Sequence, residues 1–194
     1  MKWSVLILIY VVVQFVAFMF VLVATPIDMF RIRSRDTQVL PDRCYTLWGL
    51  KTNCDSFSYR FLSDDLWESC PPRRDRFRVA QAFAVMSIFV YLAAVVLGVI
   101  MLFCCRWLRW VCLALNSVGA VTLWIVWACM AVSYHKNEGL NCEPIKEFYT
   151  YGAGFVLLVL AWLLDILNIP VLLFLCQDSG SGENGKETEN KSQK

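Results

Sequence analysis

The sequence predicts an all-α membrane protein: a four-helix transmembrane bundle topped by a small antiparallel β-sheet in the first loop. Of the 194 residues, 58% are hydrophobic, and the mean hydropathy is +0.54, which is more apolar than a soluble domain. Four apolar stretches are also long enough to cross a hydrocarbon layer of about 30 Å at about 1.5 Å per residue. We expect spans at residues 4–25, 79–105, 111–132 and 152–175.

These spans form a single membrane domain, residues 1–176. The first span, residues 4–25, is longer than the apolar region of a secretory signal peptide and has a poor cleavage site, so we expect an uncleaved anchor. Residues 177–194 contain no apolar side chain and are rich in Ser, Gly, Glu, Asn and Lys. This composition predicts a disordered cytosolic tail.

Two polar loops, residues 28–78 and 133–148, lie on one side of the membrane. The first contains the string Cys44-Tyr-Thr-Leu-Trp-Gly-Leu-Lys-Thr-Asn-Cys54, which favours an extended chain through Lys51 and a turn just after it. Apolar and polar residues then alternate over residues 56–61, which indicates a half-buried strand. We therefore expect a hairpin closed by a disulfide; the alternative is a reduced loop with two free thiols.

Four cysteines lie on the loop side of the membrane: Cys44, Cys54, Cys70 and Cys142. An even number suits two disulfides in an oxidising compartment. Four cysteines allow three pairings, of which we prefer Cys44 with Cys54 and Cys70 with Cys142.

Two rules disagree about the orientation of the loops. The two loops contain ten and two Lys and Arg residues, against six for the N-terminus, the 106–110 turn and the tail together, so positive-inside counting places the loops in the cytosol. The cysteines indicate the opposite. We follow the cysteines, because eight acidic residues are interleaved with the ten basic ones and a long loop is less controlled by charge. Both termini are then cytosolic, and the loops are extracellular.

The string in the first loop resembles the signature of the amastins, small four-span surface proteins of trypanosomatid parasites that are distantly similar to claudins and peripheral myelin proteins. The matching residues are Cys44, Thr46, Leu47, Trp48, Gly49, Lys51 and Cys54. The resemblance implies a claudin-like fold in the plasma membrane, in which Trp48 and Gly49 anchor the extracellular sheet. Lys51 stands where claudins have tryptophan, which argues against claudin-style junction strands. The Asn-x-Ser sequon, Asn190-Lys-Ser192, lies in the tail, so we do not expect N-glycosylation.

Polar residues inside the spans are the candidate intramembrane sites: Gln14, Asn116, Asp165 and Asn168. Asp165 is the one acidic residue well inside a span, where a carboxylate is costly. It is either a protonated group that bonds Gln14 or Asn168 and holds helices together, or part of a small ion, proton or solute pathway. Ala94 and Gly98 form a small-xxx-small pair that allows close helix approach or a dimer face.

The residues point to no enzyme, catalytic site, metal or cofactor, and the mixed charge argues against a nucleic-acid partner. At the membrane edge, three cysteines are candidates for S-palmitoylation or are plain thiols: Cys104, Cys105 and Cys176. The function that we expect is non-enzymatic, with the extracellular cap acting in host–parasite membrane contact or surface organisation. The expected partners are the lipid bilayer, a host membrane or surface partner, and a second copy of the chain.

Overall fold

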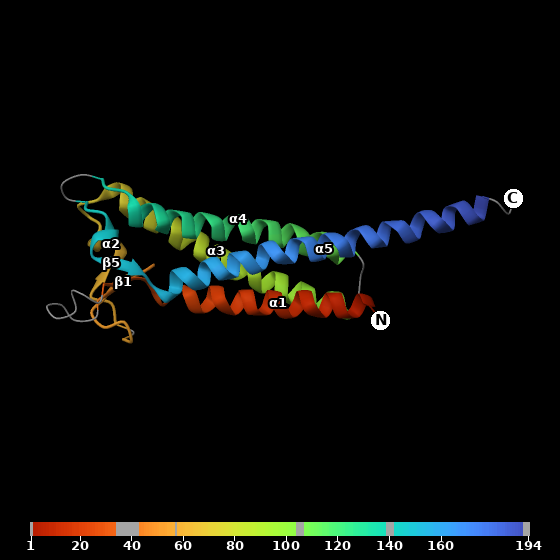
Figure 1. Cartoon of the computed structure of the whole chain (residues 1–194), viewed down its shortest axis with the longest axis horizontal. Helices are drawn as coiled ribbons and strands as arrows, with labels where there is room; N and C mark the ends of the chain where they lie inside the picture. Colours follow the sequence, from red (N-terminus) through yellow and green to blue (C-terminus); the bar gives the residue numbers. More distant parts are fainter. Residues whose placement is uncertain (1, 34–42, 57, 104–106, 139–141, 192–194) are drawn as a thin grey trace.

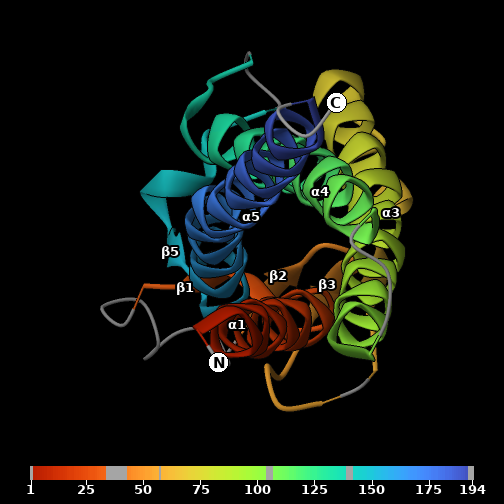
Figure 2. The same ribbon diagram turned by 90° about the vertical axis from the view of Figure 1, so that its right-hand side faces the viewer.

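The computed structural model describes residues 2–33, 43–56, 58–103, 107–138 and 142–191. In this part of the chain, four long helices form a bundle (Figure 1): α1 (Lys2–Ala24), α3 (Pro71–Phe103), α4 (Leu108–His135) and α5 (Ala153–Lys191). Seen along the bundle, each helix lies beside two others, in the order α1, α3, α4, α5 around a ring (Figure 2). Each helix contains a segment that is long and apolar enough to cross a membrane. The predicted four-span bundle is therefore confirmed.

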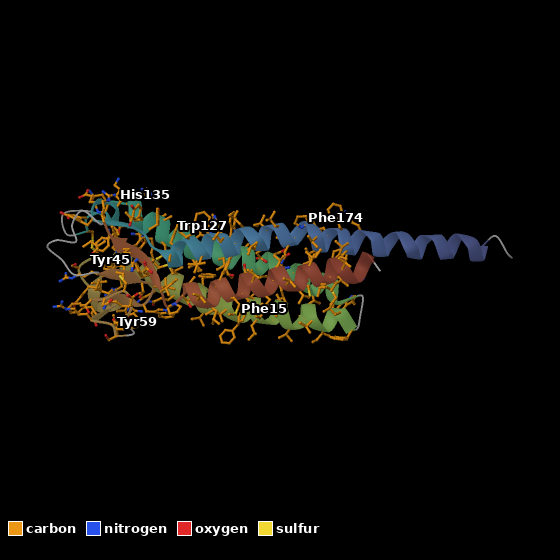
Figure 3. The ribbon with its side chains drawn as sticks, turned by 60° about the horizontal axis from the view of Figure 1, so that its bottom comes forward. Phe15, Tyr45, Tyr59, Trp127, His135 and Phe174 are labelled. Carbon is orange, nitrogen blue, oxygen red and sulfur yellow. A yellow bond between two sulfur atoms is a disulfide. The ribbon has the colours of Figure 1, made fainter. Side chains whose placement is uncertain are left out.

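The outer surface of the bundle is apolar. In the most apolar 18-residue window of each helix, only 28–39% of the residues are buried. Phe15, Phe89 and Phe174 are between 50% and 69% exposed, and Figure 3 shows Phe15 and Phe174 along the bundle. Contact of such side chains with water would cost about 25 cal/mol per Å² of apolar surface, whereas lipid removes this cost. The exposed faces therefore suit a bilayer.

Small residues let α3 approach α1 closely. Ala94 is fully buried, and a Cβ atom added to Gly98 would lie 3.0 Å from Cε1 of Tyr10 on α1. The Ala94–Gly98 pair therefore packs inside the bundle. It is not available as a dimer face, which was one of its two predicted roles.

At one end of the bundle, an antiparallel sheet forms what we call the cap (Figure 1). Among the described residues it has five strands, in the order β4-β3-β2-β1-β5. They are β1 (Asp28–Ile32), β2 (Cys44–Thr46), β3 (Gly49–Lys51), β4 (Phe61–Leu62) and β5 (Tyr149–Tyr151). The small sheet is thus confirmed, but it is not confined to the first loop. The second loop extends beyond its predicted end at residue 148, as far as the start of α5, and there includes β5, which pairs with β1.

The strand prediction within the first loop needs two corrections. The chain does not stay extended from Cys44 to Lys51, because β2 and β3 form a hairpin of their own that turns at Leu47 and Trp48. The predicted half-buried strand at 56–61 is wrong, since β4 begins at Phe61 and both of its side chains are exposed. The pairing of β4 with β3 fixes the register of β4 at these two residues. Phe57 lies outside the described residues.

Two short helices and the extended start of α3 complete the cap. These short helices are α2 (Ser63–Leu66) and η1 (Ile145–Glu147). Helix α3 begins at Pro71, eight residues before the predicted span, because Pro71 and Pro72 suit the first helical turn, where backbone N–H groups lack partners anyway. The first two turns of α3 are polar and belong to the cap.

Helix α5 continues to Lys191 and projects past the other three helices (Figure 1). The composition of residues 177–194 predicts disorder instead, since nothing apolar there can pack. The disordered tail stays a prediction.

Candidate functional site

Two side chains of the signature string attach the cap to the end of α1. The indole Nε1 of Trp48 donates a hydrogen bond to the carbonyl of Thr25 (3.1 Å), and the ammonium of Lys51 donates one to the carbonyl of Pro26 (3.2 Å). The last carbonyls of a helix have no partner within it and carry partial negative charge. A neutral and a cationic donor therefore meet the chain just where it leaves α1. Lys51 is only 5% exposed, and its hydrogen bond to the Pro26 carbonyl explains how a lysine can be buried inside the cap.

A threonine holds the turn between β2 and β3. The hydroxyl oxygen of Thr46 accepts hydrogen bonds from the backbone N–H groups of Trp48 and Gly49, both at 3.1 Å, and donates one to the carbonyl of Gly49 (3.0 Å). A Cβ atom at position 49 would overlap the carbonyl oxygen of Phe61 on β4, so this place requires glycine. Thr46 and Gly49 thus allow the sharp hairpin that points Trp48 at α1.

The middle of the turn fastens the cap to α3. Leu47 is fully buried in the core cluster, and its carbonyl accepts a hydrogen bond from Nε2 of Gln81 (2.9 Å). The same Gln81 nitrogen lies 2.7 Å from the hydroxyl of Ser63 at the start of α2. The signature string therefore contacts both α1 and α3.

Both preferred disulfides are present. Cys44 in β2 is bonded to Cys54 beyond β3, with their Cα atoms 5.6 Å apart, and Cys70 at the start of α3 is bonded to Cys142 in the second loop at 5.8 Å. By loop-closure entropy, the sequence separations of 10 and 72 residues correspond to about 3 and about 4 kcal/mol. The second bond ties the two loops together.

Two arginines of α3 reinforce that connection. Nη2 of Arg73 donates to the carbonyls of Cys142 (3.3 Å) and Glu143 (2.8 Å), and its guanidinium lies 4.8 Å from the centroid of the Trp67 ring. One turn later, Arg76 pairs with Glu138. Sequence reasoning missed these contacts, although Arg73 and Arg76 share one helix face by spacing.

Glu138 is held in its ionised form. Burial alone would raise its pKa, but the hydrogen bond from Arg76 and the charges of Arg76, Arg73 and Lys136 outweigh burial and lower the pKa below its usual range. Its side chain is only 5% exposed. The stability that the Arg76–Glu138 pair contributes should therefore be lost at acidic pH.

Aromatic rings fill the space between the sheet and the helices. Tyr45 packs between Trp67 (5.5 Å) and Tyr149 (4.7 Å), measured between ring centroids, and burial raises the pKa of its hydroxyl. A second stack joins the sheet to α4 and α5 and contains Phe30, Tyr134, Tyr151 and Phe155. These rings connect the cap rigidly to the bundle.

The edge strand β4 presents exposed apolar side chains. Tyr59, Phe61 and Leu62 are 36%, 46% and 58% exposed, and the exposed Arg60 lies between them. We call residues 59–62 the β4 patch; Figure 3 places Tyr59 at the cap end of the molecule. The ammonium of Lys51 lies 5.1 Å from the centroid of the Tyr59 ring and the guanidinium of Arg60 lies 5.6 Å from that of Phe61, so the patch combines exposed apolar surface with cationic groups.

The intramembrane polar residues do not pair as predicted. Nδ2 of Asn168 donates to Oε1 of Gln14 (3.0 Å), which joins α5 to α1, and Nδ2 of Asn116 donates to the hydroxyl of Tyr10 (3.3 Å). Asp165 bonds neither Gln14 nor Asn168, because the rotation of α5 places its carboxylate beside Gly119 of α4 instead.

The remaining predicted positions carry less information. Cys104 and Cys105 lie outside the described residues, so their acylation stays a prediction. Cys176 is buried in α5 at 8% exposure, a setting that does not favour an acylation site. Within the described ranges, no group of three or more His, Cys, Asp or Glu residues could hold a metal ion.

The fold and the signature contacts define a class: a four-span membrane protein with a disulfide-closed cap. The family model for the amastin surface glycoprotein matches residues 15–172, which is most of the chain. The chain therefore belongs to the amastin family of surface membrane proteins. A comparison with curated protein sequences gives no match.

The attachment of the cap to α1 predicts the effect of two substitutions. Trp48→Phe removes one neutral hydrogen bond and should lower the free energy of unfolding by about 1 kcal/mol, and Lys51→Met removes a charged one and should cost about 2 kcal/mol. Denaturant unfolding of the purified chain in micelles measures both. Lys136→Met is the control, since this exposed lysine makes only a surface pair with Glu138 and should change stability by less than about 1 kcal/mol. Equal losses in all three variants would contradict the anchoring role.

The Arg76–Glu138 pair predicts acid sensitivity of the cap. Because the folded-state pKa of Glu138 is lowered, the pair contributes its stability above the ordinary glutamate pKa of about 4.3, and this stability is lost as the pH falls below that value. Unfolding temperatures measured between about pH 7 and pH 3 should fall more for the native chain than for Glu138→Gln. Asp64→Asn, at an exposed pair with Arg78, should change the profile little. Parallel profiles for the native chain and Glu138→Gln would contradict the assignment.

Proposed function

We propose that this amastin is a non-enzymatic protein of the plasma membrane whose cap lies outside the cell and makes contact with a host membrane or another surface partner, or organises the surface on which it stands. The observation that carries the proposal is the cap itself: two disulfides, the α1 anchor and the aromatic stacks build a rigid platform that holds the β4 patch at the end of the molecule.

The disulfides support an extracellular cap with cytosolic termini, because such bonds persist in oxidising compartments. The many basic residues of the loops argue for a cytosolic cap, but the folded structure weakens this argument. Lys51, Arg73 and Arg76 are used there to bind carbonyls and Glu138, so their presence has a structural reason independent of the membrane side.

The chemistry of the β4 patch supports contact with a lipid surface. Aromatic and aliphatic side chains next to an arginine are the combination that enters the headgroup region of a bilayer, where rings partition and the guanidinium meets phosphates. The proposal does not involve N-linked glycans, since residues 28–78 and 133–148 contain no sequon.

The orientation predicts how the cysteines react on intact cells. Cys44, Cys54, Cys70 and Cys142 should label with an impermeant thiol reagent only after reduction, because they are bonded and outside. Mass mapping of each labelled cysteine measures this. If these four stay unlabelled after reduction while a tag on the tail is reached from outside, the orientation is reversed and the contact proposal is wrong.

The β4 patch predicts lipid binding by the whole chain. The test needs the whole chain, because β5 and Cys142 come from the second loop and an isolated first loop lacks both. Nanodiscs that contain the native chain should float with added vesicles of phosphatidylcholine and phosphatidylserine, and the Phe61→Ser, Leu62→Ser double variant should lose most of this binding.

The control is Glu147→Ser, an exposed polar change in η1 near the other edge strand, which should bind as the native chain does. Equal binding by the native chain and the double variant would exclude the β4 patch as a lipid contact. If neither binds vesicles while the labelling result holds, surface organisation through protein partners is the function that survives.

A further inference from the structure

One region of the bundle interior contains three polar side chains with buried atoms that lack a hydrogen-bond partner. Asp165 on α5 is fully buried, and within the described residues neither of its carboxylate oxygens has a hydrogen-bond partner. The same holds for the hydroxyl of Tyr91 on α3 and for Oδ1 of Asn116 on α4. Buried polar groups in folded proteins are nearly always hydrogen-bonded, so three such groups in one region call for a physical reason.

The three groups come from neighbouring places in the bundle. A Cβ atom on Gly119 of α4 would lie 2.9 Å from Cε2 of Tyr91 and 3.2 Å from Oδ2 of Asp165, so the ring and the carboxylate both pack against Gly119. The hydroxyl of Tyr91 lies close enough to the carboxylate of Asp165 to interact with it, although the two groups are not aligned as in a well-formed hydrogen bond. Asn116 lies one turn from Gly119 on the same helix, bonded through its nitrogen to Tyr10, and Tyr10 lies within electrostatic range of Asp165.

An ionised Asp165 would be expensive in this position. A carboxylate that is buried inside a membrane bundle without a partner costs several kcal/mol. The titratable groups that face it are Tyr91 from α3 and Tyr10 from α1, and no charged side chain of the described residues acts on it. Something must therefore neutralise the carboxylate. The close contact with Gly119 suits the smallest neutralising species.

We propose that Asp165 binds one exchangeable proton, and that the protonated carboxyl links α5 to Tyr91 of α3 and Asn116 of α4. The proton makes Asp165 a donor as well as an acceptor. The Tyr91 hydroxyl can donate to the carboxyl in either protonation state, whereas only the protonated carboxyl can also donate, and Oδ1 of Asn116 is the acceptor that we propose for it. One proton thus removes the charge of Asp165 and adds the donor that Asn116 lacks.

Apolar side chains close the bundle on both sides of Asp165. Toward the uncapped end, where α1 and α4 begin, Cys112 of α4 lies in a buried cluster with Ile7, Met101, Leu172 and Leu175. Toward the cap, the buried pair Ser87–Thr122 is followed on α4 by Leu123, Val126 and Met130, all fully buried. This arrangement favours binding at one place over the pathway for ions, protons or solutes that Asp165 alone suggested.

Infrared spectroscopy of the full-length chain in lipid nanodiscs tests the proposal. At neutral pH, the native chain should show a protonated carboxyl C=O band that shifts in D₂O and disappears reversibly at high pH. Asp165→Asn should lack this band. Asp64→Asn, which removes an exposed carboxylate of the cap, should keep it and serves as the matched control.

Tyr91→Phe keeps the ring and removes the hydroxyl, so the band should remain but change frequency because the carboxyl loses one hydrogen bond. This variant carries the test if Asp165→Asn does not fold. The proposal is overturned if no such band exists, if the band persists in Asp165→Asn, or if its frequency is the same in Tyr91→Phe as in the native chain. A chain whose thermal stability rises with sodium over choline at constant ionic strength, without a carboxyl band, would show a cation in place of the proton. None of these residues contacts the cap, so failure here leaves the cap's proposed function untouched.

Discussion

The cap depends on two carbonyl groups at the place where the chain leaves α1. The carbonyls of Thr25 and Pro26, directly after the helix, accept hydrogen bonds from Trp48 and Lys51 in a hairpin more than twenty residues later. These bonds hold the β2–β3 hairpin at the end of α1, and the remaining strands add to either side of it. The bond from Gln81 and the aromatic stacks then hold the same sheet on the other three helices.

The same contacts give the signature string a physical meaning. Thr46 shapes the turn, Gly49 leaves room for β4, Trp48 and Lys51 bind α1, and Leu47 enters the core. None of these side chains forms the exposed β4 patch. The string therefore determines how the cap is attached to the helices, and a different set of residues forms its exposed edge.

The spans could be predicted from the sequence because hydrocarbon thickness sets a minimum apolar length, which α1, α3, α4 and α5 all exceed. The four loop cysteines could be assigned to two bonds because they share one side of the membrane. The join between β1 and β5 could not be foreseen, since strand pairing across more than a hundred residues leaves no local pattern. The lack of a bond from Asp165 to Gln14 or Asn168 could not be foreseen either. It depends on the rotation of the helix, and that rotation follows from the packing of the whole interior.

The Cys70–Cys142 bond also fixes an order of events during biosynthesis. Its two halves stand before α3 and after α4, so both helices must be synthesised and inserted before the cysteines can meet. Cys44 and Cys54 are ten residues apart and can join as soon as the first loop emerges. Until the second loop arrives with β5 and Cys142, strand β1 keeps an open edge, which chaperones or oxidoreductases would have to protect in a newly made chain during that interval. Maturation of this cap is therefore a timed, two-stage process rather than a single folding step.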